Sequence, residues 1–163
     1  MVKPSKIKTI KGKKALFLPK NFKGITLFGV VYCNKKEDAD ELNKSEMIDS
    51  DFKNHELIHV RQAESTNDSW VLFYLKYVAE WIKNLNLITI DINAPYKFMP
   101  MEMEAYLNER NWEYSSAKAT QWKEFEKIPK KELREMAEDY YDNCRFKETF
   151  TSFLKRKLTN EQP

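Results

Sequence analysis

Residues 50–62 read Ser-Asp-Phe-Lys-Asn-His-Glu-Leu-Ile-His-Val-Arg-Gln, and the interpretation of the whole chain starts from them. The polar residues 49–51 are good helix N-caps, so a helix is predicted over 52–64. At about 100° per residue, His55 and His59 lie about 40° apart around that helix, and both imidazoles share one face. This spacing lets two nitrogen ligands meet one metal ion at about 2.0–2.1 Å.

Glu56 lies about 60° from His59 around the same helix, so its carboxylate would flank a metal ion without having to ligate it. From there Glu56 can accept a proton from a water that the metal activates, which makes it the candidate catalytic residue. The alternative is that His55 and His59 are two ordinary helix histidines, one of them paired with Glu56 or with a neighbouring carboxylate.

A catalytic zinc site needs a third protein ligand, and the chain has only two histidines. The best candidates lie on the helix predicted after Pro100, where Glu102 and Glu104 are about 200° apart and cannot both face the metal. Spacing alone does not choose between them, although a small residue at Ala105 would let this helix approach the first one closely, which favours Glu102. Other residues that could serve are Asp91, Glu80 and Cys33.

The remaining pattern predicts a mainly α fold (α+β) with a short N-terminal β element. A strand is predicted over 25–32, with a short partner at 16–18, and an irregular connection over 34–47. The predicted helices after the first cover residues 70–84, 100–112, 117–127, 129–141 and a last basic stretch to 158. Residues 87–90 either extend a helix or form a short strand.

The helix over 70–84 is apolar nearly all round and is expected to be buried in the core. Lys76, Glu80 and Lys83 interrupt it, so we expect no integral membrane segment. A buried Glu80 needs a partner, which would be Lys76 or a metal-binding histidine. Tyr96 and Tyr114 are further candidates to donate a hydrogen bond to a reacting oxygen.

Length and composition indicate one compact domain, because 163 residues with 42% apolar side chains can build a core. The 3 Gly and 6 Pro argue against collagen-like and turn-rich all-β chains. Two cysteines cannot form a disulfide framework, and no apolar signal segment follows the first residues. A cytoplasmic location is therefore expected.

We expect three parts along the chain. Residues 1–14 form a basic N-terminal arm, within a lysine-rich stretch that carries no acid up to residue 23, and such an arm could bind an anionic partner. Residues 15–115 hold the predicted metal site. Residues 116–163 form a helical C-terminal extension whose amphipathic helices either cover the core or dock a protein partner.

Four motifs resemble, in order, a group of small uncharacterised proteins of Bacteroidetes and their phages. The motifs lie at residues 26–29 (Thr-Leu-Phe-Gly), 54–62 (Asn-His-Glu-Leu-Ile-His-Val-Arg-Gln), 73–81 (Phe-Tyr-Leu-Lys-Tyr-Val-Ala-Glu-Trp) and 101–106 (Met-Glu-Met-Glu-Ala-Tyr). The arrangement is similar to gluzincin zinc metallopeptidases, including the CAAX-prenyl-protease type. That resemblance implies a zincin-like helical core in which the HExxH helix faces a Glu-bearing helix.

The resemblance also implies the ligand set. In the Glu-x-x-Ala-Asp pattern of these peptidases the first Glu completes the zinc site, and in this chain that residue is Glu102. Tyr106 stands where the peptidases carry Asp, so the partner of one ligand histidine is missing or replaced. In zincins a strand often runs beside the cleft and pairs with an extended peptide, and residues 25–32 are the candidate here.

These observations lead to two hypotheses. The first is a zinc-dependent metallopeptidase acting on a peptide or protein substrate, with Zn²⁺ held by His55, His59 and Glu102 and with Glu56 as the base. The second is a catalytically silent structural or interaction protein, such as a phage virion component, that retains a zincin scaffold for assembly.

Overall fold

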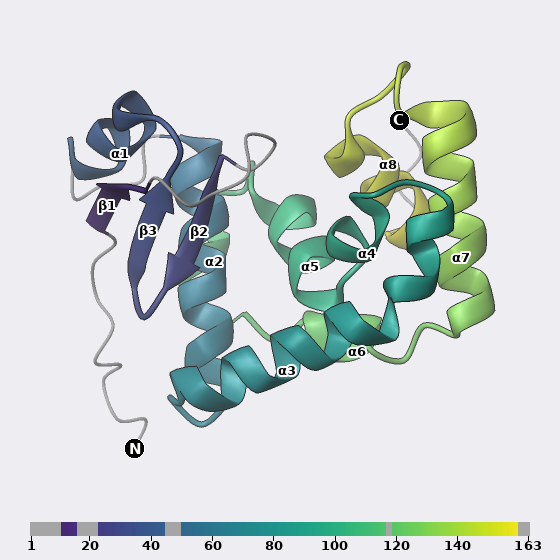
Figure 1. The fold of residues 1–163 in the computed structure, drawn as a ribbon, viewed down its shortest axis with the longest axis horizontal. Helices are drawn as coiled ribbons and strands as arrows, with labels where there is room; N and C mark the ends of the chain where they lie inside the picture. Colours follow the sequence, from purple (N-terminus) through teal and green to yellow (C-terminus); the bar gives the residue numbers. More distant parts are fainter. Residues whose placement is uncertain (1–10, 16–22, 45–49, 117–118, 160–163) are drawn as a thin grey trace.

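The computed structural model describes residues 11–15, 23–44, 50–116 and 119–159. The fold is mainly α with one small sheet, as predicted (Figure 1). Its elements are β1 (Lys11–Lys14), β2 (Gly24–Leu27), β3 (Val30–Cys33), α1 (Lys36–Asn43), α2 (Asp51–Ser65), α3 (Trp70–Lys83), η1 (Leu85–Thr89), α4 (Ala94–Lys97), α5 (Pro100–Asn108), η2 (Tyr114–Ser116), α6 (Trp122–Phe125), α7 (Lys130–Asp139), η3 (Tyr140–Cys144) and α8 (Phe150–Leu158). The sheet and α7 lie at opposite ends of the molecule, with α2 and α5 between them (Figure 1).

The sheet has the strand order β1-β3-β2, with β1 parallel and β2 antiparallel to β3. The prediction of one strand over 25–32 is wrong, because a tight turn divides it into β2 and β3. Phe28 and Gly29 form that turn with φ angles of 51° and 79°. Two left-handed residues suit a two-residue hairpin, but only the glycine signals one in the sequence.

The region before and after the hairpin is more ordered than predicted. Residues 11–14, assigned to the basic arm, form β1, and α1 occupies most of the predicted irregular connection over 34–47. Gly12 exchanges two hydrogen bonds of 2.9 Å with the Asn43 side chain, and a Cβ at Gly12 would lie 2.5 Å from the Ala39 carbonyl oxygen. The predicted strand at 16–18 and residues 1–10 of the arm lie outside the described residues.

The helices α2 and α3 match their predictions in type and position because their caps are local. Ser50 and Ser69 each accept a backbone N–H of the following turn. Between the helices, Asn67 and Asp68 have φ angles of 60° and 56°, a left-handed conformation that asparagine and aspartate tolerate. The chain therefore reverses in a few residues, and α3 runs back beneath the sheet and α5 (Figure 1).

The prediction that the 70–84 helix is buried is wrong. Within α3 only Phe73 and Glu80 are buried, and Leu75 is 64% exposed. The exposed apolar stripe of α3 consists of Val71, Leu75, Val78 and Ile82. A helix that is apolar on every side does not reveal from its sequence which face packs inward. No helix in the described part of the chain is long and apolar enough to cross a membrane.

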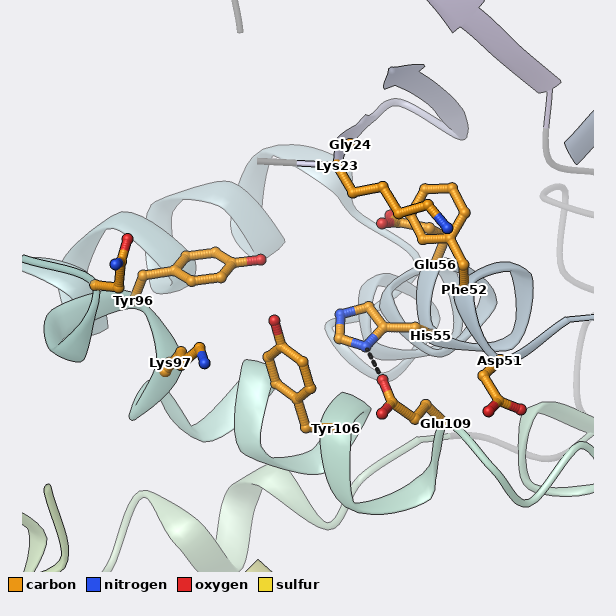
Figure 2. A pocket seen from close by; sticks show the side chains of 11 residues that line it. Lys23, Gly24, Asp51, Phe52, His55, Glu56, Tyr96, Lys97, Tyr106 and Glu109 are labelled. Carbon is orange, nitrogen blue, oxygen red and sulfur yellow. Dashed lines mark hydrogen bonds and ion pairs between the residues drawn. The ribbon is translucent and has the colours of Figure 1, made fainter. Parts of the chain in front are cut away.

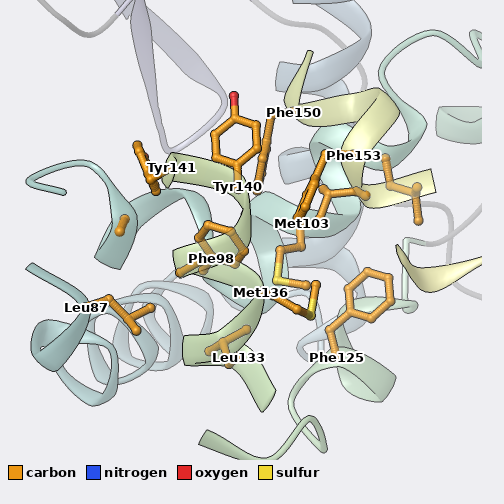
Figure 3. Close-up of a cluster of buried hydrophobic side chains, with 14 residues drawn as sticks. Leu87, Phe98, Met103, Phe125, Leu133, Met136, Tyr140, Tyr141, Phe150 and Phe153 are labelled. Carbon is orange, nitrogen blue, oxygen red and sulfur yellow. The ribbon is translucent and has the colours of Figure 1, made fainter. Parts of the chain in front are cut away.

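The largest hydrophobic cluster joins α5 to the C-terminal helices (Figure 3). Met103 of α5 packs among side chains of α4, α6, α7 and α8, so the C-terminal helices cover the core. Their bounds differ from the prediction: α6 is a single turn, and η3, a π-helical segment, separates α7 from α8. The helix after Pro100 also ends earlier than predicted, at Asn108.

Candidate metal centre

Helices α2 and α5 pack against each other and bring three side chains of the predicted site together. His55 Nε2 lies 3.5 Å from Glu102 Oε2, and His59 Nε2 lies 3.1 Å from Glu102 Oε1. One ligand atom from each of the three residues falls within 4.8 Å of the others. All three side chains are buried, and Glu102 is 0% exposed.

These distances suit a bound metal ion. Ligand bonds of about 2.1 Å at a tetrahedral angle place neighbouring ligand atoms about 3.4 Å apart. The two nitrogen–oxygen distances of 3.1 and 3.5 Å bracket that value. The group of His55, His59 and Glu102 could therefore hold a metal ion.

One oxygen of Glu102 has no hydrogen-bond partner among the described residues. Tyr77 donates its hydroxyl to Glu102 Oε1 at 2.6 Å, whereas the buried Oε2 receives no hydrogen bond. A fully buried carboxylate oxygen without a partner is costly, and a cation would relieve that cost. The unsatisfied oxygen is on the same carboxylate that faces both histidines.

Glu104, the alternative that spacing left open, has a different role. Its carboxylate accepts hydrogen bonds of 2.7 Å from Gln62 Nε2, from the Tyr114 hydroxyl and from the Gln121 backbone N–H. These bonds satisfy the Glu104 carboxylate away from the histidines. The Tyr114 hydroxyl therefore donates to Glu104 and does not reach the candidate centre.

The other acids and the thiol considered as ligands lie elsewhere. Glu80 pairs with Lys83, one turn later on α3, and with neither Lys76 nor a histidine. Asp91 accepts the Asn93 backbone N–H at 2.8 Å, and Cys33 is packed in the apolar cluster of the sheet and α1. Burial raises the pKa of the Cys33 thiol to about 12, so it stays a neutral side chain.

The second nitrogen of each histidine is held by a neighbour. His55 Nδ1 lies 3.1 Å from Glu109 Oε2, and His59 Nδ1 lies 2.8 Å from Gln62 Oε1. Gln62 donates its amide nitrogen to the Met101 carbonyl at 2.8 Å, so its oxygen must be the atom that faces His59. In the neutral form of each histidine, Nδ1 therefore carries the hydrogen and the Nε2 lone pair faces the space where a cation would bind.

Sequence reasoning missed both of these supporting residues, although signals for them were present. Gln62 lies three residues after His59 on α2, within side-chain reach. Glu109 lies seven residues after Glu102, at the C-cap of α5, and so lies nearly in line with Glu102 along the helix. Glu109 thereby gives His55 a carboxylate partner, which the Tyr at position 106 had put in doubt. The Tyr106 ring packs edge-on against His55, with ring centres 4.7 Å apart.

Electrostatics couple the three residues strongly. Burial alone lowers the pKa of His55, but its interactions with the Glu102 and Glu109 carboxylates outweigh burial and raise the pKa to about 10. Burial also lowers the pKa of His59, whereas the Glu102 carboxylate raises it. The net result is a pKa above the usual value. Burial raises the pKa of Glu102, yet the two histidines hold it well below its usual range. A metal ion would have to displace protons from these histidines.

Glu56 lies beside the centre but is not one of its three converging residues. The Thr26 hydroxyl of β2 donates a hydrogen bond to Glu56 Oε2, which fixes the buried carboxylate against the sheet. Two cavities meet at Glu56, one containing His55 and the other containing His59 and Glu102. In the first cavity the hydroxyl of Tyr96 points toward the same space as the His55 ring (Figure 2).

Strand β2 is an edge strand, and residues of its whole length line the second cavity. The Tyr74 hydroxyl donates to the Thr26 carbonyl at 2.9 Å and accepts the Phe28 backbone N–H at 2.8 Å. Tyr74 therefore occupies part of the β2 edge on which an extended peptide was predicted to pair. The stretch of this edge near Gly24 remains for such pairing.

Comparisons of the chain with protein-family models, with curated proteins and with solved structures find no match. The resemblance to gluzincins therefore stays a prediction, and the chemistry of the centre has to be inferred from its own residues.

Proposed function

We propose that the protein is a zinc-dependent hydrolase of peptide bonds. The observation that carries this proposal is the orientation of the two histidines, whose Nδ1 atoms are occupied and whose Nε2 atoms face the buried Glu102 carboxylate. Two imidazoles and one carboxylate form a ligand set of catalytic zinc sites, which keep the fourth position for water or substrate.

When bound, a zinc ion would lower the pKa of a water and polarise the scissile carbonyl. Glu56, fixed by Thr26 at the junction of the two cavities, accepts a proton as the water oxygen adds to the carbonyl carbon. The C–N bond then breaks, and Glu56 returns the proton to the leaving amine. Tyr96 borders both cavities and donates a hydrogen bond to the carbonyl oxygen as negative charge develops on it.

The test combines metal analysis with turnover. The purified protein should contain about one zinc ion per chain, and the His55→Ala and His59→Ala variants should lose it. Glu56→Gln should keep the zinc but lose cleavage of a mixed peptide library. Wild-type protein that binds no zinc from a buffered solution would refute the proposal, and a Glu56→Gln variant that still cleaves would remove the assigned base.

The exposed apolar stripe of α3 supports a second candidate function, an assembly protein without turnover. Monomeric proteins rarely leave a large contiguous apolar face in water. Sedimentation of the zinc-loaded protein alone and with candidate partners separates the two functions, because stoichiometric assembly without cleavage of any peptide supports the second one.

A further inference from the structure

Two cavities open onto the candidate metal centre from different sides. The apolar cavity measures about 560 Å³ and includes His59 and Glu102 in its wall, and the charged cavity measures about 430 Å³ and includes His55. Their walls share Gly24, Glu56 and Tyr96. A chain that crosses the centre would therefore place one side chain in each cavity.

The apolar cavity is built by β2 and α3. Ile25 and Leu27 come from the strand, and Phe73, Val78 and Trp81 come from the helix. Its ionisable groups of acid or histidine type are Glu56, His59 and Glu102, which are the residues of the centre itself. Away from the centre, this cavity offers mainly apolar surface, which favours a bulky apolar side chain.

The charged cavity has both signs of charge in its wall: the carboxylates of Asp51, Glu56 and Glu109, and the lysines Lys23 and Lys97. Lys97 lies in its wall, and its ammonium group is 5.3 Å from the ring centres of Tyr140 and Phe150 (Figure 2). Within the described residues Lys97 forms no ion pair. The nearby Glu109 is already satisfied, since it accepts hydrogen bonds from His55 and from the Thr151 hydroxyl.

A half-buried ammonium group without an ionic partner favours an anionic ligand group. Burial lowers the pKa of Lys97, although the negative charges of Asp91 and Glu109 act in the opposite direction. Lys23, the other lysine of this cavity, instead lies 3.7 Å from Asp38 and 4.1 Å above the Phe52 ring. Lys97 is therefore the residue in this cavity that is suited to a carboxylate.

We infer that the substrate is a peptide that presents a bulky apolar side chain to the apolar cavity and a carboxylate to Lys97, on the two sides of the bond at the centre. This inference rests on the proposed function, because it specifies the substrate class of the same site. It places selectivity in residues outside the ligand set, so it can be tested without turnover.

The probe is a set of blocked hexapeptides that carry Phe or Ser next to Asp or Lys at their centre, in both orders. Binding is measured by calorimetry to the zinc-loaded Glu56→Gln protein, which keeps the peptide intact. Peptides with Phe and Asp should bind at least about tenfold more tightly than those that lack either residue. Affinities within twofold of each other across the set would overturn the inference.

Two pairs of variants assign the selectivity. Val78→Arg, on a half-exposed position of the cavity wall, should abolish the preference for Phe, and Lys97→Met should abolish the preference for Asp. The matched controls are Leu75→Arg, on the exposed face of α3, and Lys131→Met on α7, which should keep both preferences. A uniform loss of binding to every peptide in Val78→Arg or Lys97→Met would overturn the assignment of that residue.

These outcomes remain separate from those of the proposed function. Zinc-loaded wild-type protein that binds the peptides selectively but cleaves none would refute the hydrolase and leave the cleft assignment intact. Cleavage of peptides irrespective of their Phe and Asp content would support the hydrolase and refute the cleft assignment.

Discussion

Replacement of Gln62 by methionine tests whether the hydrogen bonds around the centre prepare it for a metal ion. Gln62 is fully buried and joins His59 on α2 to Met101 and Glu104 on α5. Methionine has nearly the same length and volume, so packing changes little while every polar contact of the side chain is lost.

The magnitude follows from the three hydrogen bonds. Loss of the amide removes one hydrogen-bond partner from the His59 Nδ1–H, from the Met101 carbonyl and from one Glu104 oxygen. Each group left unsatisfied destabilises the protein by about 1–3 kcal/mol. Other bonds to Glu104 offset part of this cost, so we expect the free energy of unfolding to fall by about 3 kcal/mol. Zinc affinity should fall about 10- to 100-fold, because His59 is no longer held in one tautomer and orientation.

The matched variant is Gln62→Glu, which keeps an acceptor for His59 but places a second carboxylate beside Glu104. It should therefore lose stability and yet keep more zinc affinity than Gln62→Met. Urea unfolding with a chelator measures the first quantity, and titration against a competing zinc indicator measures the second. Equal zinc affinity in Gln62→Met and the wild type would refute the argument that Gln62 sets the histidine for metal binding.

Three further predictions concern other parts of the molecule. Tyr96→Phe should lower kcat about 100-fold with unchanged zinc content, as expected for loss of a donor to a developing oxyanion, and an unchanged kcat would exclude that role. Gly12→Ala should lower the free energy of unfolding by about 1–3 kcal/mol, because the added Cβ would clash with the Ala39 backbone. Urea titration measures this change, and a smaller effect would mean that α1 shifts to make room. The raised pKa of His55 stabilises the metal-free protein fully below about pH 6.5, and this stabilisation is lost as the pH rises toward about 10. Unfolding free energies measured with a chelator should therefore fall between pH 7 and 8.5 by about 1.4 kcal/mol per pH unit for each histidine that stays protonated, and a flat profile would contradict the charge pairing with Glu102.

The sequence predicted those features that short-range physics determines. A helix with histidines four residues apart needs only a cap and regular geometry, and both are present in α2. The approach of Glu102 was a weaker prediction, because it depended on how two helices pack. Ala105, whose small side chain favoured Glu102 over Glu104, is indeed buried where α5 contacts α2.

The features that were missed depend on long-range contacts. The turn at Phe28 requires a left-handed phenylalanine, which the hairpin imposes against local preference. Helix α1 is polar and shows little apolar periodicity, and it is anchored by contacts to β1 that lie about thirty residues away in sequence, such as that of Gly12 with Asn43. The exposed face of α3 is as apolar as a buried helix face would be. Only the packed structure therefore shows which face of α3 lies in water.

The two side-chain amides of α2 explain how this fold keeps the candidate ligands opposite one another on two helices. Asn54 donates to the carbonyl oxygens of Asn108, Glu109 and Asn111 at 3.1, 2.8 and 3.0 Å, where α5 ends. Gln62 donates to the Met101 carbonyl at 2.8 Å, where α5 begins. The two residues are eight positions apart on α2, and both histidines lie between them.

Because α5 is held at both ends by buried hydrogen bonds, it cannot slide along α2 without breaking them, and Glu102 stays in register with the histidines. The same contacts that stabilise the helix pair therefore keep the ligand set preorganised, and a metal ion would bind there without the cost of assembling its site.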